Sequence, residues 1–148
     1  MGFTACAKKK ADMQLKFALL ADAVNESRDG KLNITGEFNA IIAEQVPLQW
    51  PVMVLVARIE AGLAEGTAHR FHVDLVDENG QQLLEDLPTV DARFVGGGEG
   101  LPLRANFIVS LVGLQFQSYG TYQIRVFVDD EFVGDTMLHV VERLPVKP

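Results

Sequence analysis

Several residue types on which small proteins often depend are scarce in this chain. Its 148 residues include one cysteine, Cys6, so no disulfide can form within the chain. The lack of a disulfide fits a reducing compartment, and we expect a cytoplasmic protein. Of the three histidines, His69 and His72 are three residues apart on an expected strand and would project from opposite faces. A zinc or iron site is therefore disfavoured, and we expect no metal and no cofactor.

Basic residues and long apolar runs are also scarce. The 13 Lys and Arg residues are outnumbered by 20 Asp and Glu residues, which gives a formal net charge of −7. Binding to nucleic acid needs a basic face that neutralises phosphates, so we expect no nucleic-acid partner. The longest apolar run, Val52 to Ala57, is far shorter than the roughly 20 residues that span a membrane. We therefore expect a soluble, acidic protein without a membrane partner.

The length of the chain corresponds to one domain. Residues Met1 to Asp12 lack strand alternation and contain Lys8-Lys9-Lys10, whereas an alternating segment begins at Met13. We expect a flexible extension over residues 1–12, a β-sandwich domain over residues 13–144 and a short tail over residues 145–148.

Two-residue alternation is the dominant pattern in the sequence. Phe71, Val73 and Leu75 alternate with polar residues and precede the turn Asp77-Glu78-Asn79-Gly80. The same pattern returns in Tyr122 to Val128, which precedes another acidic turn. Repeated hairpins predict an all-β fold, a single antiparallel β-sandwich of immunoglobulin-like or related Greek-key type with eight or nine strands.

The expected strands are separated by turn and loop signals. They are Gln14–Ala23, Lys31–Ile42, Val52–Glu60, Ala68–Val76, Gln81–Asp86, Val90–Val95, Leu103–Leu114, Thr121–Val128 and Thr136–Val141. Gly36 inside the second strand predicts a bulge or a crossing between sheets. The segment Val46 to Pro51 contains two prolines and is expected to be a loop, because proline cannot donate to a central ladder.

Apolar residues at alternating positions define the expected core. They are Phe17, Leu19, Leu32, Ile34, Val54, Val56, Phe71, Val73, Leu75, Phe107, Val109, Leu111, Tyr122, Ile124, Val126, Leu138 and Val140.

Segments along most of the chain resemble a family of small bacterial β-sandwich proteins of unknown function. The residues that carry the likeness are Phe17 to Ala23, Gly30 to Phe38, Ala57 to Glu60, Asp77 to Gly80 and Gly120 to Ile124. The resemblance spans about Met13 to Glu142. It implies a compact β-sandwich and supplies no established activity.

A glycine-rich loop is the first candidate for a functional segment. It consists of Gly96, Gly97, Gly98, Glu99 and Gly100. A phosphate-binding loop needs Lys followed by Ser or Thr and then a helix, whereas Leu101-Pro102-Leu103 follows here and Glu99 would repel a phosphate. We interpret it as a strand connector and as a candidate ligand or partner loop.

Acidic turns and aromatic residues leave two further binding hypotheses. Oxygen ligands for calcium could come from Asp77 to Asn79 and from Asp129, Asp130, Glu131 and Asp135, although Asp and Asn are ordinary turn residues and no EF-hand spacing is present. Trp50, Tyr119 and Tyr122 could form a platform for a sugar, although the strand pattern places Tyr122 in the core.

Catalysis finds little support in the sequence. There is no Gly-x-Ser-x-Gly motif, and Cys6 lies in the extension. The acids Glu37, Glu60, Asp74 and Glu85 would form an active site only if the fold brought them together. We assign no catalytic residue.

A non-enzymatic binding or assembly module is the leading functional hypothesis. Phe127, Val133 and Met137 fall out of phase with the inward-facing residues of the last strands, and outward apolar residues can mark an interface. We expect a protein partner or self-association, with the hairpin from Tyr122 to Val141 in the interface. The alternatives are a carbohydrate- or calcium-binding sandwich, or an enzyme whose acids assemble only in space.

Overall fold

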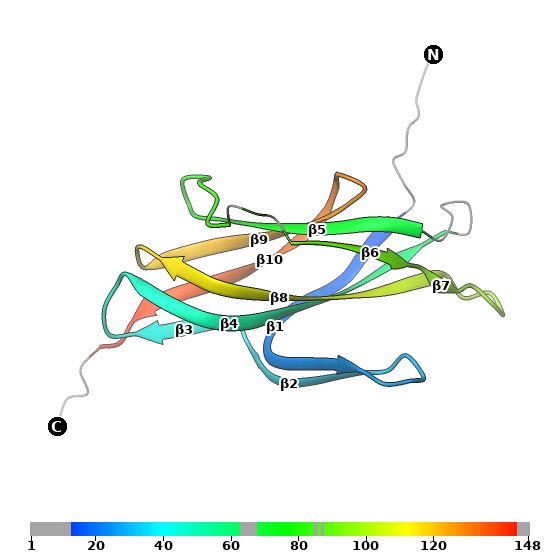
Figure 1. Ribbon diagram of the computed structural model, residues 1–148, viewed down its shortest axis with the longest axis horizontal. Helices are drawn as coiled ribbons and strands as arrows, with labels where there is room; N and C mark the ends of the chain where they lie inside the picture. The colour runs from blue at the N-terminus through cyan, green and yellow to red at the C-terminus, as the bar shows by residue number, and fades with distance from the viewer. Residues whose placement is uncertain (1–12, 63–67, 85, 87, 145–148) are drawn as a thin grey trace, which may run out of the picture.

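The computed structural model describes residues 13–62, 68–84, 86 and 88–144, and this part of the chain forms ten strands in two five-stranded sheets (Figure 1). The strands are β1 (Met13–Glu26), β2 (Leu32–Phe38), β3 (Ala40–Ala43), β4 (Leu48–Ala61), β5 (Ala68–Val76), β6 (Thr89–Arg93), β7 (Val95–Gly96), β8 (Leu103–Phe116), β9 (Gly120–Val128) and β10 (Glu131–Glu142). Sheet A has the order β2-β1-β4-β8-β7, and sheet B has the order β3-β10-β9-β5-β6. The predicted extension and tail lie outside the described residues.

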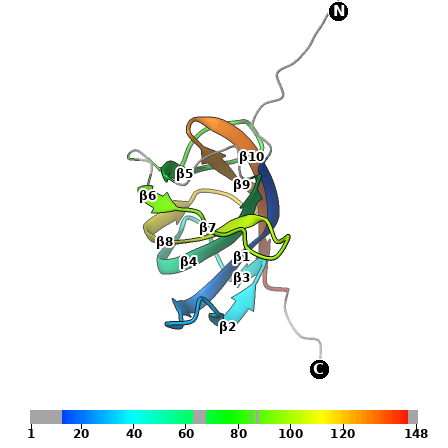
Figure 2. The same cartoon turned by 90° about the vertical axis from the view of Figure 1, so that its right-hand side faces the viewer.

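The strand order is that of an immunoglobulin-like sandwich. Immunoglobulin domains place strands A, B, E and D in one sheet and strands C, F and G in the other. Here strands A, B, E and D correspond to β1, β4, β8 and β7, and strands C, F and G correspond to β5, β9 and β10. Strand β6 adds to β5, and β3 pairs in parallel with β10. Figure 2 shows the two sheets stacked as layers. The predicted all-β sandwich is confirmed, with ten strands instead of eight or nine.

Tyr122 makes a contact that is characteristic of this fold. Its hydroxyl donates to the carbonyl of Ser118 at 2.7 Å, just before β9 begins, which is the geometry of a tyrosine corner. The ring is buried and lies edge-on to Phe116, with ring centroids 4.9 Å apart. Ile124, two residues later, is fully buried at the position where antibody domains carry a disulfide cysteine. Aliphatic packing therefore replaces the inter-sheet disulfide.

Most of the predicted core residues are buried. The prediction is wrong for four of them, which are only half-buried: Phe17, Leu19, Leu32 and Ile34. A β-bulge between Leu15 and Phe17 shifts the pairing of β1 with β4 by one residue. Since side chains alternate across a strand, the bulge reverses the face of every later residue. Leu20 consequently enters the core, and the Phe17 ring lies beneath the guanidinium of Arg58.

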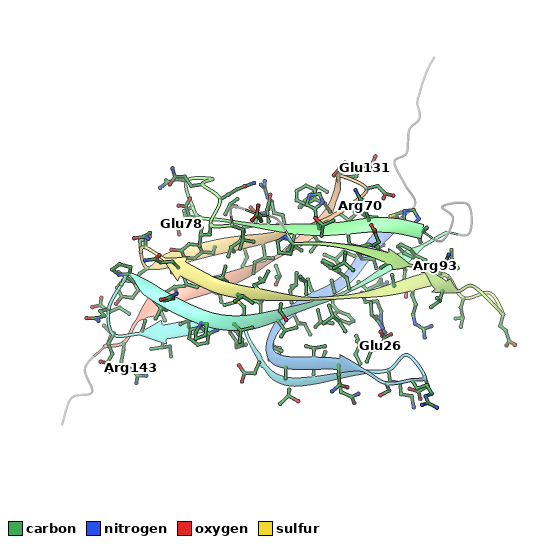
Figure 3. The ribbon with its side chains drawn as sticks, viewed as in Figure 1. Glu26, Arg70, Glu78, Arg93, Glu131 and Arg143 are labelled. Carbon is green, nitrogen blue, oxygen red and sulfur yellow. The ribbon has the colours of Figure 1, made fainter. Side chains whose placement is uncertain are left out.

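The β1–β2 hairpin covers part of the outer face of sheet A. Val54 and Val56 alternate with the core residues of β4, yet only 9% and 0% of their surface is exposed. The hairpin folds beneath β4 and β8 (Figure 1, blue), and Glu26 near its tip points toward them (Figure 3). Asn106 on β8 donates to the Glu26 carboxylate at 2.8 Å and also contacts the carbonyl of Gly30. The half-buried Leu32 and Ile34 belong to this hairpin.

The predicted strand Lys31–Ile42 divides between the two sheets. Its first part is β2 in sheet A, and after Asn39 its second part is β3 in sheet B. Gly36 has a φ of +72°, and a Cβ at this position would collide with the carboxylate of Asp22. The predicted change of sheet does occur within this segment, but it follows Phe38 and not Gly36, and β2 pairs with β1 in register on both sides of Gly36.

The prediction of a loop over Val46–Pro51 is wrong for its second half, because β4 begins at Leu48. Pairing of β1 with β4 ends at Ala21 and Val54, so Pro51 lies where β4 has a partner on one side only. Gly113 stands across from it on β8 with a φ of +66°. Around this point both strands change the face that they turn inward. Trp50 and Leu114 therefore pack on the core, whereas Val52 and Val112 are exposed.

Two more boundaries differ from the prediction. The segment Gln81–Asp86 forms a single bridge, from Gln82 to Val76, instead of a strand. The predicted strand Val90–Val95 is divided into β6 in sheet B and β7 in sheet A. Each division creates an extra strand, which accounts for the larger total. No helix among the described residues is long and apolar enough to cross a membrane.

The tyrosine corner predicts a stability difference between two tyrosines. Tyr122→Phe removes the hydroxyl that donates to the Ser118 carbonyl, and we expect it to lower the free energy of unfolding by about 1–2 kcal/mol. Tyr119→Phe is the matched control, since its hydroxyl contacts the Ala43 carbonyl at a longer 3.3 Å and is half-buried. Urea unfolding followed by circular dichroism measures both. Equal losses would contradict the assignment of Tyr122 as the corner residue.

Candidate functional site

An aromatic row crosses the outer face of sheet B, the face turned away from the core. It consists of His72 on β5, Phe127 on β9 and Phe132 on β10, which are successive cross-strand neighbours. The His72 ring is stacked on Phe127 with centroids 4.6 Å apart and planes 3° apart. Phe132 meets Phe127 edge-on at 5.9 Å and is 54% exposed. The row therefore ends in an exposed aromatic ring.

A bidentate ion pair lies beside the aromatic row. The Nε and Nη2 groups of Arg125 donate to the two carboxylate oxygens of Asp74 at 2.8 and 2.7 Å. Asp74 is only 3% exposed, and these hydrogen bonds raise the pKa of the Arg125 guanidinium. The guanidinium also lies 5.8 Å from the centroid of Phe127. Since both oxygens of Asp74 are used, Arg125 is held in one orientation with about a third of its side chain exposed.

A groove of about 850 Å³ lies at one end of this face, between the start of β5, strand β6 and the β9–β10 turn. Its lining includes His69, Arg70, Asp91, Arg93, Asp129 and Asp130. Figure 3 labels Arg70 and Arg93 on its rim. The exposed Arg70 side chain donates to Asp91 at 3.0 Å. The groove therefore carries charges of both signs.

Asp129 connects the β9–β10 turn to β5. Its carboxylate accepts the backbone N–H of Arg70 at 3.0 Å and lies 2.5 Å from Nδ1 of His69. Partial burial alone would raise the pKa of Asp129, but the hydrogen bonds from Arg70 and His69 outweigh it and lower the pKa. Asp129 and Asp130 both have positive φ angles, 51° and 70°. The turn is thus fixed by its backbone and by the contact with His69.

The acidic turns do not assemble a calcium site in the described part of the chain. No group of three or more His, Cys, Asp or Glu side chains there is placed to hold a metal. The Asp77 carboxylate instead accepts the backbone N–H groups of Asn79 and Gln81, and Glu78 accepts that of Thr121. These acids stabilise turns by bonding to nearby backbone, as is common for Asp in hairpins.

The three predicted interface residues are not equivalent in the structure. Phe127 and Met137 lie on the outer face of sheet B, and Met137 is 41% exposed. Val133 packs against the core, because a bulge between Phe132 and Gly134 turns it inward. The same bulge turns Phe132 outward, and the sequence analysis did not predict Phe132 as a surface residue. The one available signal was the apolar residue directly after the Asp129-Asp130-Glu131 turn.

The other predicted site residues are dispersed. The glycine loop belongs to the β7–β8 connection of sheet A, where Gly96 is part of β7 and Leu101 donates to Gly98 in a turn. The aromatic residues proposed as a sugar platform serve the fold, since Tyr122 is buried and Trp50 packs against the core. Among the proposed catalytic acids, Glu37 and Glu60 lie in sheet A and Asp74 lies in sheet B. Glu85 lies outside the described residues.

The fold and this surface define an immunoglobulin-like β-sandwich with an organised outer face. The chain belongs to a family of unknown function, DUF6941, whose sequence profile matches residues 16–141. The resemblance to such a family is thereby confirmed. No curated protein matches the sequence.

Three solved structures are similar to this chain at low sequence identity. An immunoglobulin-like protein from Pseudomonas aeruginosa is 16% identical, with a TM-score of 0.38, and the match covers 88% of this chain and 97% of that one. An alkylpurine DNA glycosylase from Pseudomonas fluorescens, bound to DNA containing an abasic site analogue, is 9% identical with a TM-score of 0.45, and the match covers 88% of this chain but only 31% of the glycosylase. A structural genomics target is 13% identical, with a TM-score of 0.33 and 87% coverage of each chain. Such low identities and TM-scores give no information about activity.

The ion pair on the outer face predicts that Asp74 contributes more to the free energy of unfolding than Asp91 does. Asp74→Ala leaves the Arg125 guanidinium without its partner over a largely buried site, and we expect the free energy of unfolding to fall by at least about 2 kcal/mol. Asp91→Ala removes the partner of Arg70 where both side chains are mostly exposed, so we expect little change. Chemical unfolding of both variants at neutral pH checks this, and equal stability of Asp74→Ala and the wild type would contradict it.

The lowered pKa of Asp129 predicts how the free energy of unfolding depends on pH. Its pKa is lower in the folded state than the value near 3.9 of an unfolded chain, so its carboxylate stabilises the fold above about pH 4. This contribution is lost as the pH falls through the folded pKa. In Asp129→Asn, the free energy of unfolding should therefore decline less between about pH 4 and pH 2 than it does in the wild type. Urea titrations across this range measure the slopes, and parallel curves for the two proteins would argue against the prediction.

Proposed function

We propose that the protein is a non-enzymatic binding module that recognises a partner protein through the outer face of sheet B. The single observation that carries this proposal is the partly exposed Arg125, which the buried Asp74 holds in place next to the aromatic row. Binding hot spots are enriched in arginine and aromatic residues that lie together. This face of the described structure combines both.

The composition of the surrounding surface supports a protein as the ligand. Exposed apolar side chains alternate with polar ones beyond the aromatic row: Met137, Val141 and Ile42 are 41%, 41% and 58% exposed, with Asp135 and His139 between the apolar positions of β10. Val141 and Ile42 are cross-strand partners. A surface that mixes aromatic and aliphatic side chains with polar ones is the usual composition of a protein interface.

The rigidity of the face also supports recognition. Arg125 is held by two hydrogen bonds, and Phe127 is in contact with rings on both neighbouring strands. Side chains that are already ordered lose little conformational entropy when a partner binds. The groove beside β6 extends this surface with charged groups that could orient the partner.

The test is a capture experiment from a cell lysate with three matched variants. Phe132→Ala removes the exposed ring of the aromatic row, Val112→Ala removes a 69% exposed side chain from sheet A, and a third variant shortens residues 96–100. We expect Phe132→Ala to weaken binding of the partner, identified by mass spectrometry, by at least tenfold, because an anchor aromatic typically contributes about 2 kcal/mol or more.

The controls separate this face from the glycine loop. Val112→Ala and the shortened loop should both retain the partner at wild-type levels. Loss of the partner only when residues 96–100 are shortened would assign recognition to the loop instead of the outer face of sheet B. Equal capture by the wild type and Phe132→Ala would overturn the proposal.

A further inference from the structure

Strand β8 has a long free edge. On one side it pairs with β4 along its whole length, from Leu103 to Phe116. On the other side it pairs with β7 only at Leu103 and Arg104. Residues Ala105 to Phe116 have no strand partner on that side among the described residues. In an antiparallel ladder every second residue directs its N–H and C=O away from its neighbour, so β8 presents a row of hydrogen-bonding groups to an incoming strand.

Up to Gly113, where φ is +66° and the strand changes its inward face, the free edge lacks the features that usually prevent pairing. The sequence from Ala105 to Phe116 contains no charged residue and no proline. Edge strands are commonly protected by charged side chains, proline or short length. The β7 strand provides such protection only at Leu103 and Arg104, where β8 carries its one charge. The rest of the edge is open to another strand.

The uncharged edge is the part of the surface where a second copy of this acidic chain meets the least like-charge repulsion, and it offers nothing to a strongly charged partner. With 20 acidic residues and a net charge of −7, two copies repel each other over most of their surface. An edge of twelve uncharged residues removes like-charge contacts from the place where the two backbones would meet. Two identical strands can pair antiparallel about a two-fold axis, which is the simplest closed symmetry.

We infer that two copies associate through antiparallel pairing of β8 with β8, about a two-fold axis at Ser110. Ser110 of each copy then faces Ser110 of the other, and Val112 faces Ile108 of the other copy. Val112 is 69% exposed, so it is available to be covered. On the core side, Leu111 would lie opposite Val109 of the other copy. The change of face at Gly113 would limit the paired segment to residues 107–113 of each copy, because Gly113 lies opposite Phe107 of the other copy in this register.

This interface is separate from the proposed binding face. It lies on the edge of sheet A, whereas Arg125 and the aromatic row lie on sheet B. Joining the two A sheets would leave both binding faces uncovered, so the dimer would present its partner-binding surface twice. The two proposals therefore fail independently of each other.

The two-fold axis at Ser110 allows a charge-exchange experiment. Ser110 is exposed and uncharged, so substitutions there should leave the fold intact. We expect the wild type to be a dimer at tens of micromolar by analytical ultracentrifugation. Ser110→Lys and Ser110→Glu each place like charges opposite each other and should weaken the dimer at least tenfold. Mixing the two variants pairs Lys with Glu and should restore a dimer.

Two controls distinguish this edge from other surfaces. Val52→Lys adds a charge on the same face of sheet A, one strand in from the edge, and should weaken the dimer much less. Phe132→Ala changes the outer face of sheet B and should leave the dimer unchanged. Circular dichroism establishes that each variant is folded. In the wild type, hydrogen exchange should show alternate amides of residues 107–113 protected at high protein concentration and exposed on dilution.

The outcomes are decisive in either direction. A wild type of 16.3 kDa at concentrations up to about 100 micromolar would overturn the inference. So would a dimer that survives Ser110→Lys, or one that Phe132→Ala dissociates, since the latter result would assign self-association to the hairpin from Tyr122 to Val141. Homodimers lost in both charged variants and regained in their mixture would establish the β8 register.

Discussion

Burial of β4 on both of its faces is the constraint on which the rest of the structure depends. One face of β4 contributes Met53, Leu55 and Ala57 to the core between the sheets, and all three are fully buried. The other face carries Val54 and Val56, which would be exposed in a simple two-layer sandwich. The β1–β2 hairpin is therefore required as a cover, and its position depends on the hydrogen bond from Asn106 to Glu26. The continuous apolar run in the sequence is explained by this arrangement.

The same burial explains how the fold is stable without a disulfide. Antibody domains join their sheets covalently, whereas this chain fills the space between the sheets with aliphatic and aromatic residues, among them Phe71, Phe107 and Ile124. Phe71 and Phe107 come from opposite sheets and have ring centroids 5.4 Å apart. The tyrosine corner then fixes the start of β9, and β9 is the strand that carries Arg125 and Phe127 to the outer face. Core packing and the candidate binding face are thus positioned by one strand.

Alternation of apolar and polar residues predicted the fold class and most strand positions, because it records which residues are buried. It could not predict where the chain changes sheets. Residues 31–42 and 89–96 each show one unbroken strand-like pattern in the sequence, and it is pairing with distant strands that divides them into β2 with β3 and β6 with β7. The position of Pro51 in a strand was missed for the same reason. Proline is tolerated there because β1 stops pairing with β4 at Ala21, about 30 residues earlier in the sequence.

The candidate site was predicted least well, and bulges are the physical reason. A bulge inserts one residue and reverses the inward and outward faces beyond it, which no local pattern reveals. The bulge at Phe132–Gly134 sends Val133 to the core and Phe132 to the surface, opposite to the assignment from periodicity. Exposure of Phe132 sacrifices hydrophobic burial, yet the fold keeps its ring against Phe127, which itself lies close to the Arg125 guanidinium. A bulge that turns an aromatic ring outward beside a fixed arginine is better explained by a role for that surface than by stability of the sandwich.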